Sequence, residues 1–447
     1  MSYHAPVTTS ELLFNAVVQR KVASRIIAGP RAVAALIAAL CAFTASAQEA
    51  LRSSIAGERA AAERKRALEN QSYNLRLGPV SFLLDSSLSF ELNDSVNLST
   101  AGNQEDLIVR PQLNTRAYWP LTEKNALYFS VGVGYAKYFN HPVYDRFLVT
   151  PGSELSFDLF VKDFRFTFFD RFSYTQNPLD NGAISGVANY GGLDNQAGLN
   201  ALWDLNKAIL SVGYAHANWI SSTPQFAYLD RASELFFARA AFLPNPTTAV
   251  GIEATGSLTE YDQSFLNNSV GFSAGVFAEW KLTTKLQLKP RVGYVNYQFD
   301  TEGPIGRAGN PSTYYFSLDI DHRLNESISH SLEGGREVRL GTFSDFEELY
   351  FVRHGITWNL IKDVHLSTQW FYEHGTYPPF VFFVATNQPV FLFGETFDRF
   401  GAGLSLSYRL MEKLYISLAY RFTLKDSDQR VRDYQQNALT LGLTYRF

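Results

Sequence analysis

The last stretch of the chain, Gln436 to Phe447, alternates between apolar residues and small or polar residues with a period of two. This spacing predicts a β-strand that has one face against an apolar environment. The chain ends with Tyr445 and Phe447 on the apolar face. Because a strand of a soluble sandwich alternates in the same way, the remainder of the chain must decide between a sandwich and a membrane barrel.

The composition favours strands that cross a membrane. The chain has 36 Phe and 24 Tyr among 447 residues, although 18% of its residues are charged. After Phe43 it contains no run of about 18 uncharged apolar residues, which a membrane-spanning helix requires. Abundant aromatic residues without long apolar runs are typical of transmembrane strands, whose apolar residues alternate with polar ones.

The same alternation begins near Gly78 and continues to the end of the chain. The first strands are expected at 80–92, 107–119 and 127–135. Continuing this count predicts about 18 strands, an even number as in bacterial single-chain barrels. The sequence therefore repeats the pattern of its last strand throughout.

A few positions do not fit a single strand phase. In 234–242 and 292–299 both parities carry apolar residues, so the alternation does not assign an inward face there. Asp170 and Arg336 fall on the expected lipid side, which indicates either a β-bulge or a shifted phase. Glu348 also falls there, but it is expected near the outer rim.

The connections between the expected strands fall into two classes that alternate along the chain. Short hydrophilic turns alternate with longer connections, which is typical of an up-and-down barrel with periplasmic turns and external loops. We therefore predict an all-β fold, a transmembrane antiparallel up-and-down barrel of about 16 to 18 strands over residues 78–447. The tight turns are expected at Thr122 to Asn125, Lys162-Asp163, Asn206-Lys207, Pro244 to Thr247, Thr283 to Lys285, Asn325 to Ser327, Lys362-Asp363 and Met411 to Lys413.

Residues 1–47 are expected to be a secretory signal peptide. Basic residues precede the apolar core Ala32 to Phe43, and Ala45 to Ala47 supplies the small residues of a cleavage site. Cys41 is the only cysteine, which excludes a disulfide framework and a cysteine-based metal site. Residues 48–77 are expected to form a periplasmic helix or linker ahead of the barrel.

One segment has the composition of a helix. Glu49 to Asn70 is rich in Ala, Arg and Glu, and Arg59, Glu63 and Arg66 stand at helical pair spacings. Leu51 belongs to a thin apolar stripe on this helix. One hypothesis is a solvated periplasmic helix or a frayed tail. The other is a docking helix for a periplasmic protein, or a plug in the mouth of the barrel.

Two motifs and the aromatic ending resemble known outer-membrane sequences. Asn93 to Val96, followed by Ile108 to Leu113, is similar to the opening of the porins grouped as porin-2-like proteins, with the order of Asp and Asn reversed. The ending at Phe447 resembles the C-terminal insertion signal of bacterial outer-membrane barrels. These resemblances imply outer-membrane lipid and the barrel-assembly machinery as partners. They also imply either a passive pore or an accessory of exopolysaccharide export.

If the apolar face of the strands meets lipid, the opposite face lines a lumen. That face carries both signs of charge on neighbouring strands. Such charges either pair with one another and stiffen the wall or set a field that selects solutes in a water-filled pore. The candidate pore-lining residues are Arg110, Arg116, Glu154, Asp158, Arg165, Arg171, Asp319, Asp321, Arg323, Glu333, Glu337, Arg339, Arg353, Glu373, Arg399, Arg409, Arg421 and Arg446.

The longest external connection is unusually apolar. It runs from Tyr377 to Phe393, and an apolar patch of this size is rarely left in water. Folding into the lumen as a constriction is favoured slightly over packing on the rim or binding a partner. The candidate constriction residues are Phe380, Phe382, Phe383, Phe391 and Phe393.

Enzymatic functions find little support. Gly271 to Gly275 matches the nucleophile-elbow pattern, but Ser273 lies within an alternating run with no helix after it. The eight histidines have no metal-ligand spacing, and we predict no catalytic residue, metal or cofactor. The formal charge of −4 becomes more negative once the basic leader is removed, which argues against nucleic acid as a partner.

The function predicted from the sequence is passive diffusion of small hydrophilic solutes across the bacterial outer membrane, without an enzymatic step. The alternative is a structural or accessory barrel in exopolysaccharide export or envelope assembly, in which the helix at Glu49 to Asn70 binds a periplasmic protein. A barrel-borne hydrolase is a third, weaker hypothesis.

Overall fold

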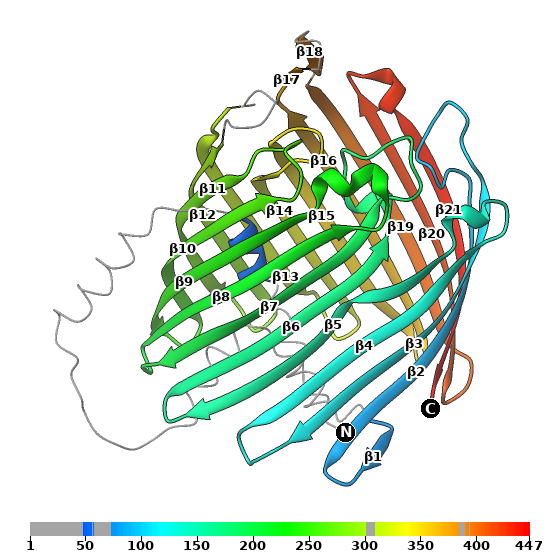
Figure 1. Ribbon diagram of the computed structural model, residues 1–447. Helices are drawn as coiled ribbons and strands as arrows, with labels where there is room; N and C mark the ends of the chain where they lie inside the picture. The colour runs from blue at the N-terminus through cyan, green and yellow to red at the C-terminus, as the bar shows by residue number, and fades with distance from the viewer. Residues whose placement is uncertain (1–47, 56, 58–72, 301–308, 384–388, 393) are drawn as a thin grey trace.

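A computed structural model describes residues 48–55, 57, 73–300, 309–383, 389–392 and 394–447. The expected signal peptide and residues 58–70 lie outside these ranges. The described chain forms one closed antiparallel barrel of 18 long strands, in which each strand pairs with the next along the chain (Figure 1). The long strands are β2 (Val80–Asn93), β3 (Asp106–Pro120), β4 (Ala126–Tyr138), β5 (Arg146–Val161), β6 (Phe164–Gln176), β7 (Gly191–Asp204), β8 (Ala208–Ser221), β9 (Arg231–Asn245), β10 (Thr248–Tyr261), β11 (Ser269–Lys281), β12 (Leu286–Phe299), β13 (Ser312–Arg323), β14 (Ile328–Leu340), β15 (Phe346–Ile361), β16 (Val364–Tyr377), β19 (Glu395–Arg409), β20 (Leu414–Ser427) and β21 (Tyr434–Arg446).

The shorter elements lie at the ends of the barrel. β1 (Leu75–Leu77) pairs with the start of β2. β17 (Phe380–Phe383) and β18 (Pro389–Leu392) form a separate two-stranded sheet. The 3₁₀ turns are η1 (Pro142–Tyr144), η2 (Pro178–Asp180), η3 (Pro224–Leu229) and η4 (Arg430–Arg432).

The last strand closes the barrel, as the sequence predicts. Leu439 of β21 pairs with Tyr420 of β20, and Leu441 pairs with Phe90 of β2. The Phe447 side chain is 48% exposed, and its amide donates to the Leu84 carbonyl. Because both neighbours of β21 are paired over most of their length, the sheet has no long free edge.

The predicted tight turns all fall between consecutive strands and gather at one end of the barrel (Figure 1). In the two-residue turns Lys162-Asp163 and Lys362-Asp363, Lys162 and Asp363 have φ values of 56° and 73°. Tight hairpins require such left-handed backbone conformations. The longer connections and the β17–β18 hairpin lie at the opposite, external end.

The strands present an apolar face outward. Leu404, Leu418 and Val292 are each about half exposed in the isolated chain, at 49%, 50% and 51%. Trp280 and Trp358 are also exposed beside the short turns, as expected for an interfacial aromatic girdle. An up-and-down barrel with this exterior is an outer-membrane barrel, and lipid covers the exposed side chains. No helix among the described residues is both long enough and apolar enough to span a bilayer.

The two charges on the expected lipid side do face outward, so the predicted strand phase is correct at both positions. The Arg336 guanidinium lies 2.7 Å from the Glu348 carboxylate and 4.5 Å from the Tyr314 ring centroid. Asp170 accepts a hydrogen bond of 2.6 Å from Asn195, another outward-facing residue. Pairing on the outer surface offsets the cost of these polar groups.

One stretch of the wall has an incomplete ladder. β13 and β14 pair only from Arg323–Ser329 to Phe316–Arg336, and the external part of β14 pairs with β15 alone. The Arg336 guanidinium donates to the Tyr314 carbonyl across the unpaired interval. Side chains thus replace backbone hydrogen bonds in this part of the wall.

The lipid face can be tested with a matched pair of substitutions on β19. Leu404→Arg should destabilise the barrel by roughly 2–4 kcal/mol, because it places a charge in the hydrocarbon region. Ser405→Arg puts the same side chain on the inner face, beside Ser367 and Ala419, and should cost much less. Urea unfolding of the refolded barrel in lipid vesicles measures both. Equal costs would contradict the assigned faces.

Candidate channel lumen

The registers place all 18 candidate pore-lining residues on the inward-facing positions of their strands. Glu154, for example, pairs with Arg171, and Glu373 pairs with Arg399. Arg421 lies between Tyr420 and Phe422 on β20, and the Tyr420 side chain is exposed to the outside. The inward face is therefore densely charged, and the charges differ in how tightly neighbouring side chains hold them.

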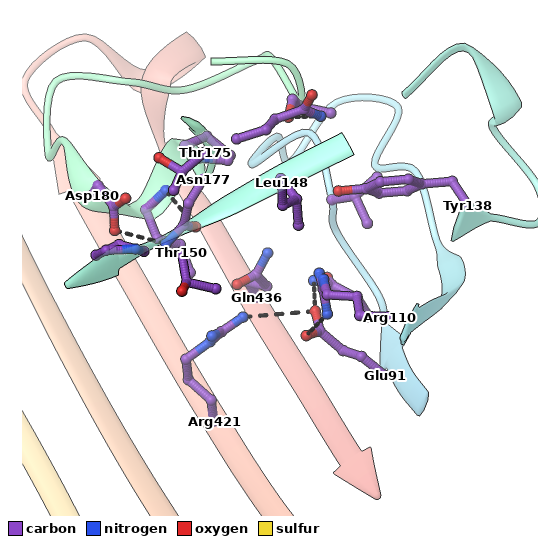
Figure 2. A pocket seen from close by; sticks show the side chains of 17 residues that line it. Glu91, Arg110, Tyr138, Leu148, Thr150, Thr175, Asn177, Asp180, Arg421 and Gln436 are labelled. Carbon is purple, nitrogen blue, oxygen red and sulfur yellow. Dashed lines mark hydrogen bonds and ion pairs between the residues drawn. The ribbon is translucent and has the colours of Figure 1, made fainter. Parts of the chain in front are cut away.

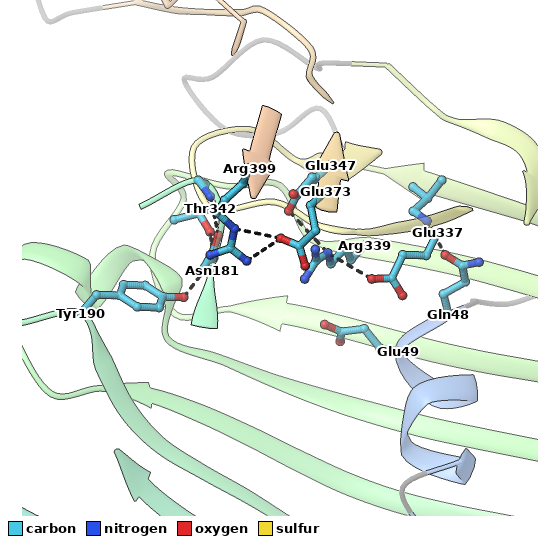
Figure 3. Close-up of polar contacts among 12 residues, drawn as sticks. Gln48, Glu49, Asn181, Tyr190, Glu337, Arg339, Thr342, Glu347, Glu373 and Arg399 are labelled. Atoms are coloured by element: carbon cyan, nitrogen blue, oxygen red, sulfur yellow. Dashed lines mark hydrogen bonds and ion pairs between the residues drawn. The ribbon is translucent and has the colours of Figure 1, made fainter. Parts of the chain in front are cut away.

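Six charged side chains on β14, β15, β16 and β19 form two adjacent groups of ion pairs, which we call together the ion-pair row. The Glu373 carboxylate lies 3.1 Å from the Arg353 guanidinium and also contacts Arg399. Arg339 lies 3.4 Å from Glu337 at the other end of the row. Buried charges held in this way stiffen the wall. The members of this ion-pair row are Glu337, Arg339, Glu347, Arg353, Glu373 and Arg399. Figure 3 shows all of them except Arg353 with their labels.

Other inward ion pairs were not among the sequence candidates. The Arg291 guanidinium lies 2.8 Å from the Glu253 carboxylate, and Arg239 lies 2.5 Å from Glu279. One pair joins β9 to β11 and the other joins β10 to β12. Apolar residues on both parities in parts of β9 and β12 prevent the sequence from assigning the inward face there. The register of a neighbouring, unambiguous strand would have revealed them.

The external connection between β6 and β7, residues 177–190, crosses the lumen; we call it the crossing loop. Its Ala183 is fully buried against Leu349 and other inward side chains of β15, β16 and β19, which lie across the barrel from β6 and β7. Arg399 donates a hydrogen bond of 2.7 Å to the Leu179 carbonyl. The crossing loop is therefore fastened at the far wall and narrows the channel.

Polar contacts and close packing fix the middle of the crossing loop. The Asn181 amide donates to the Thr342 hydroxyl at 2.5 Å, and Arg432 donates to the Ala183 carbonyl at 2.8 Å. A Cβ atom at Gly182 would lie 2.9 Å from the Phe397 ring, so only glycine permits this approach. Figure 3 shows Asn181 beside the ion-pair row, so the loop and the row form one polar network.

The sequence prediction assigned the constriction to a different loop. Residues 380–383 and 389–392 form the β17–β18 hairpin, which pairs only with itself and stands at the external rim (Figure 1). Phe393 and the side chains of Phe380, Phe382, Phe383 and Phe391 lie outside what the structure describes. A role for these residues in constriction therefore stays a prediction, whereas the crossing loop is a constriction that the sequence did not predict.

A cavity of about 380 Å³ opens beside the base of the crossing loop. Figure 2 shows Arg110 and Arg421 near the carboxylate of Glu91, at distances of 2.7 Å and 3.8 Å. Glu91 and Arg110 form the tighter pair, and the Arg421 side chain is 45% exposed. Arg421 is therefore the more available of the two guanidinium groups to a solute. Gln436, Thr150, Thr175, Asn177 and Asp180 add polar groups to the lining.

Asp180 reaches this cavity from the crossing loop. Desolvation by the surrounding protein raises the pKa of the Asp180 carboxyl, although its hydrogen bond from Asn177 and the charges of Arg399 and Arg421 act in the opposite direction. The docked loop therefore favours the neutral carboxyl. The stabilising contribution of the neutral Asp180 carboxyl to the docked loop is fully present at a pH below the ordinary pKa of this group. It is lost as the pH rises through the raised pKa of the docked state.

Residues 48–55 form a short helix inside the barrel, which we call the lumen helix (Figure 1). The expectation of a solvated periplasmic helix is wrong for these residues, and a plug agrees with their position. Ala50 packs on inward side chains of β6, β8 and β9, and Leu51 belongs to an apolar cluster with residues of β12 to β15. Neighbouring residues of the helix therefore contact two different parts of the inner wall. Residues 58–70 of the expected helix lie outside the described ranges.

Arg421 gives a test of the charged lining. Arg421→Gln should shift the reversal potential in a salt gradient toward cation selectivity, because Glu91 keeps its partner Arg110 while the cavity loses one positive charge. Lys124→Gln, in the exposed turn between β3 and β4, removes the same charge far from the cavity. An unchanged potential in Arg421→Gln, or equal shifts in both variants, would contradict a path past Arg421.

Ser273 lies in a regular part of the sheet. It is buried in β11, which continues to Lys281, and its hydroxyl lies 2.7 Å from the Thr255 hydroxyl. A cross-strand hydroxyl pair of this kind supports the packing of neighbouring strands. The string Gly271 to Gly275 is thus part of a regular strand and lacks the strand-to-helix turn of a nucleophile elbow.

The sequence matches no protein-family model and no curated protein. Solved structures with similarity to the chain include OccK2 (OpdF) of Pseudomonas aeruginosa in complex with glucuronate, with a TM-score of 0.47 and 10% identity over 83% of this chain and 99% of that one. The outer-membrane protein opdK of Pseudomonas aeruginosa has a TM-score of 0.44 and 11% identity, over 82% and 99%. A BenF-like porin of Pseudomonas fluorescens Pf-5 has a TM-score of 0.45 and 12% identity, over 83% and 100%.

Proposed function

We propose that this chain is a porin-like channel for passive diffusion of small hydrophilic solutes across the bacterial outer membrane. The observation that carries the proposal is the charged inward face of an 18-stranded barrel, since barrels of this size enclose an aqueous channel unless something fills them. Solutes would pass the cavity at Arg421 and be selected by charge and by the width left beside the crossing loop. No bond is made or broken in this mechanism.

The proposal is tested by planar-bilayer recording of the purified, folded barrel. We expect discrete current steps in a simple salt solution. Swelling of vesicles in solutions of small sugars or amino acids tests uptake of uncharged and charged solutes separately. A folded barrel that gives neither steps nor swelling would overturn the proposal.

Assembly partners remain part of the proposal. The aromatic end at Tyr445 and Phe447 faces outward at the rim with the short turns, where the two rings lie 5.3 Å apart. Recognition of this strand by the barrel-assembly machinery is consistent with that position. Phe447→Ser, assayed for the amount of folded barrel in outer membranes, tests it.

A further inference from the structure

Among the apolar clusters on the inner wall of the described barrel, one lies on β12 and β13. Val295, Tyr297, Phe299 and Tyr315 point inward from β12 and β13, Phe346 of β15 packs against them, and each of the five is at most 9% exposed. We call these five side chains the inner apolar patch. A patch of this kind inside an aqueous lumen requires a cover.

The lumen helix supplies part of that cover, together with Val338 and Leu340 of β14. Leu51 is 7% exposed and packs into the cluster of the inner apolar patch, and Ile55, one helical turn later, packs against the same cluster. An isolated helix of this length is unstable in water. Its order therefore comes from the wall on which it sits.

Polar contacts fix the direction of the lumen helix in the site. The Gln48 side chain accepts a hydrogen bond from the Val338 amide, in the part of β14 that has no partner on β13 (Figure 3). On the opposite wall, Gln196 donates to the Ser53 hydroxyl at 2.6 Å, and Arg231 lies 3.5 Å from Glu49. The helix thus accepts from one amide in the incomplete part of the ladder, and the segment bridges two walls of the lumen.

We propose that the inner apolar patch and the adjoining free edge of β14 form a binding site for a short amphipathic helix. Residues 48–55 are its resident occupant, and their seating narrows the channel. The second part rests on the proposed channel function. A helix that binds this site needs two apolar residues one turn apart, as Leu51 and Ile55 are. It also needs a side-chain amide oxygen, as in Gln48, that accepts a hydrogen bond from the Val338 N–H.

Seating is tested without any measurement of current. In a Cys41→Ser background, Leu51→Cys should react with a membrane-impermeant thiol reagent many times more slowly than Arg52→Cys, because Arg52 is exposed and Leu51 is buried. Unfolding the barrel should abolish the difference. Equal rates in the folded barrel would overturn the binding site.

Narrowing is tested by conductance. Leu51→Asp should increase the single-channel conductance several-fold, while Ser54→Asp, with the same added charge on a half-buried position, should leave it near the wild-type value. A synthetic peptide of residues 48–57 should block the Leu51→Asp channel, and a peptide with Asp at position 51 should not. Wild-type conductance in Leu51→Asp would overturn the narrowing. If every variant fails to conduct but Leu51→Cys stays protected, the channel function fails and the binding site stands.

Discussion

Replacing residues 178–189 by a short Gly-Ser linker should raise the single-channel conductance several-fold. The crossing loop is fastened to the far wall by Ala183, Asn181 and the Arg399–Leu179 hydrogen bond, and the conductance of a water-filled pore is set by its narrowest section. The linker would leave β6 and β7 paired along their whole length. The measurement is planar-bilayer recording of the refolded variant beside the wild type.

The control for this deletion is the other external loop. Replacing residues 380–392 removes the β17–β18 hairpin, which pairs with no strand of the barrel sheet. A larger gain from this second deletion would show that the apolar hairpin is the main constriction, as the sequence predicts. An unchanged conductance after removal of the crossing loop would contradict its role as a constriction.

Glu373→Ala should destabilise the barrel by roughly 3–5 kcal/mol, because loss of one partner leaves a buried charge without compensation. The Glu373 and Arg399 side chains are 4% and 6% exposed, and the Glu373 carboxylate contacts both Arg399 and Arg353. Arg399 also binds the crossing loop. The same substitution should therefore raise the conductance by loosening that loop.

Asp321→Ala is the matched control. Asp321 also faces inward and lies 2.8 Å from Lys289, but its side chain is 43% exposed. Loss of a solvated pair of this kind should cost at most about 1 kcal/mol. Urea unfolding in lipid vesicles compares the two variants. A Glu373→Ala cost no larger than that of Asp321→Ala would contradict a stabilising ion-pair row.

Much of the fold could be predicted from the sequence because a two-residue period fixes the face of every residue in a strand. The tight turns and the closing partner of β21 follow from that period and from the parity of the strand count. The same period identifies Arg421 and Glu373 as inward-facing. The two-residue period cannot show that Arg421 is accessible to a solute while Glu373 is buried. That difference depends on which loops and side chains cover each residue.

The crossing loop escaped prediction for a physical reason. Residues 177–190 contain apolar residues such as Ala183 and Ile184, but these are small in number beside the phenylalanines of residues 380–393. Length and apolar content favoured the second loop. What draws the first loop inward is a set of distant partners, including Phe397 and Thr342, which local sequence does not reveal.

For the lumen helix, the sequence favours a solvated periplasmic helix and offers a plug in the barrel mouth as an alternative. Its apolar stripe is thin, so a solvated helix suited its composition. The missing information was a receptor on the wall, and the sequence contained a sign of it. The segments 234–242 and 292–299 carry apolar residues on both parities, and some of their inward members, Leu235 and Tyr297 among them, pack in the clusters that contain Ala50 and Leu51. In these segments the alternation is ambiguous because the strand has apolar residues on both its lipid-facing and its lumen-facing side.

The incomplete ladder between β13 and β14 also bears on local unfolding of the barrel. Between the Phe316–Arg336 pair and the external rim, β13 and β14 share no backbone pairing, although β14 still pairs with β15. Separation of β13 from β14 in this interval breaks side-chain contacts only, so its free energy lies at the low end of the range in the molecule. Hydrogen exchange of the Val338 amide should then report the residence time of the lumen helix, since Gln48 protects that amide.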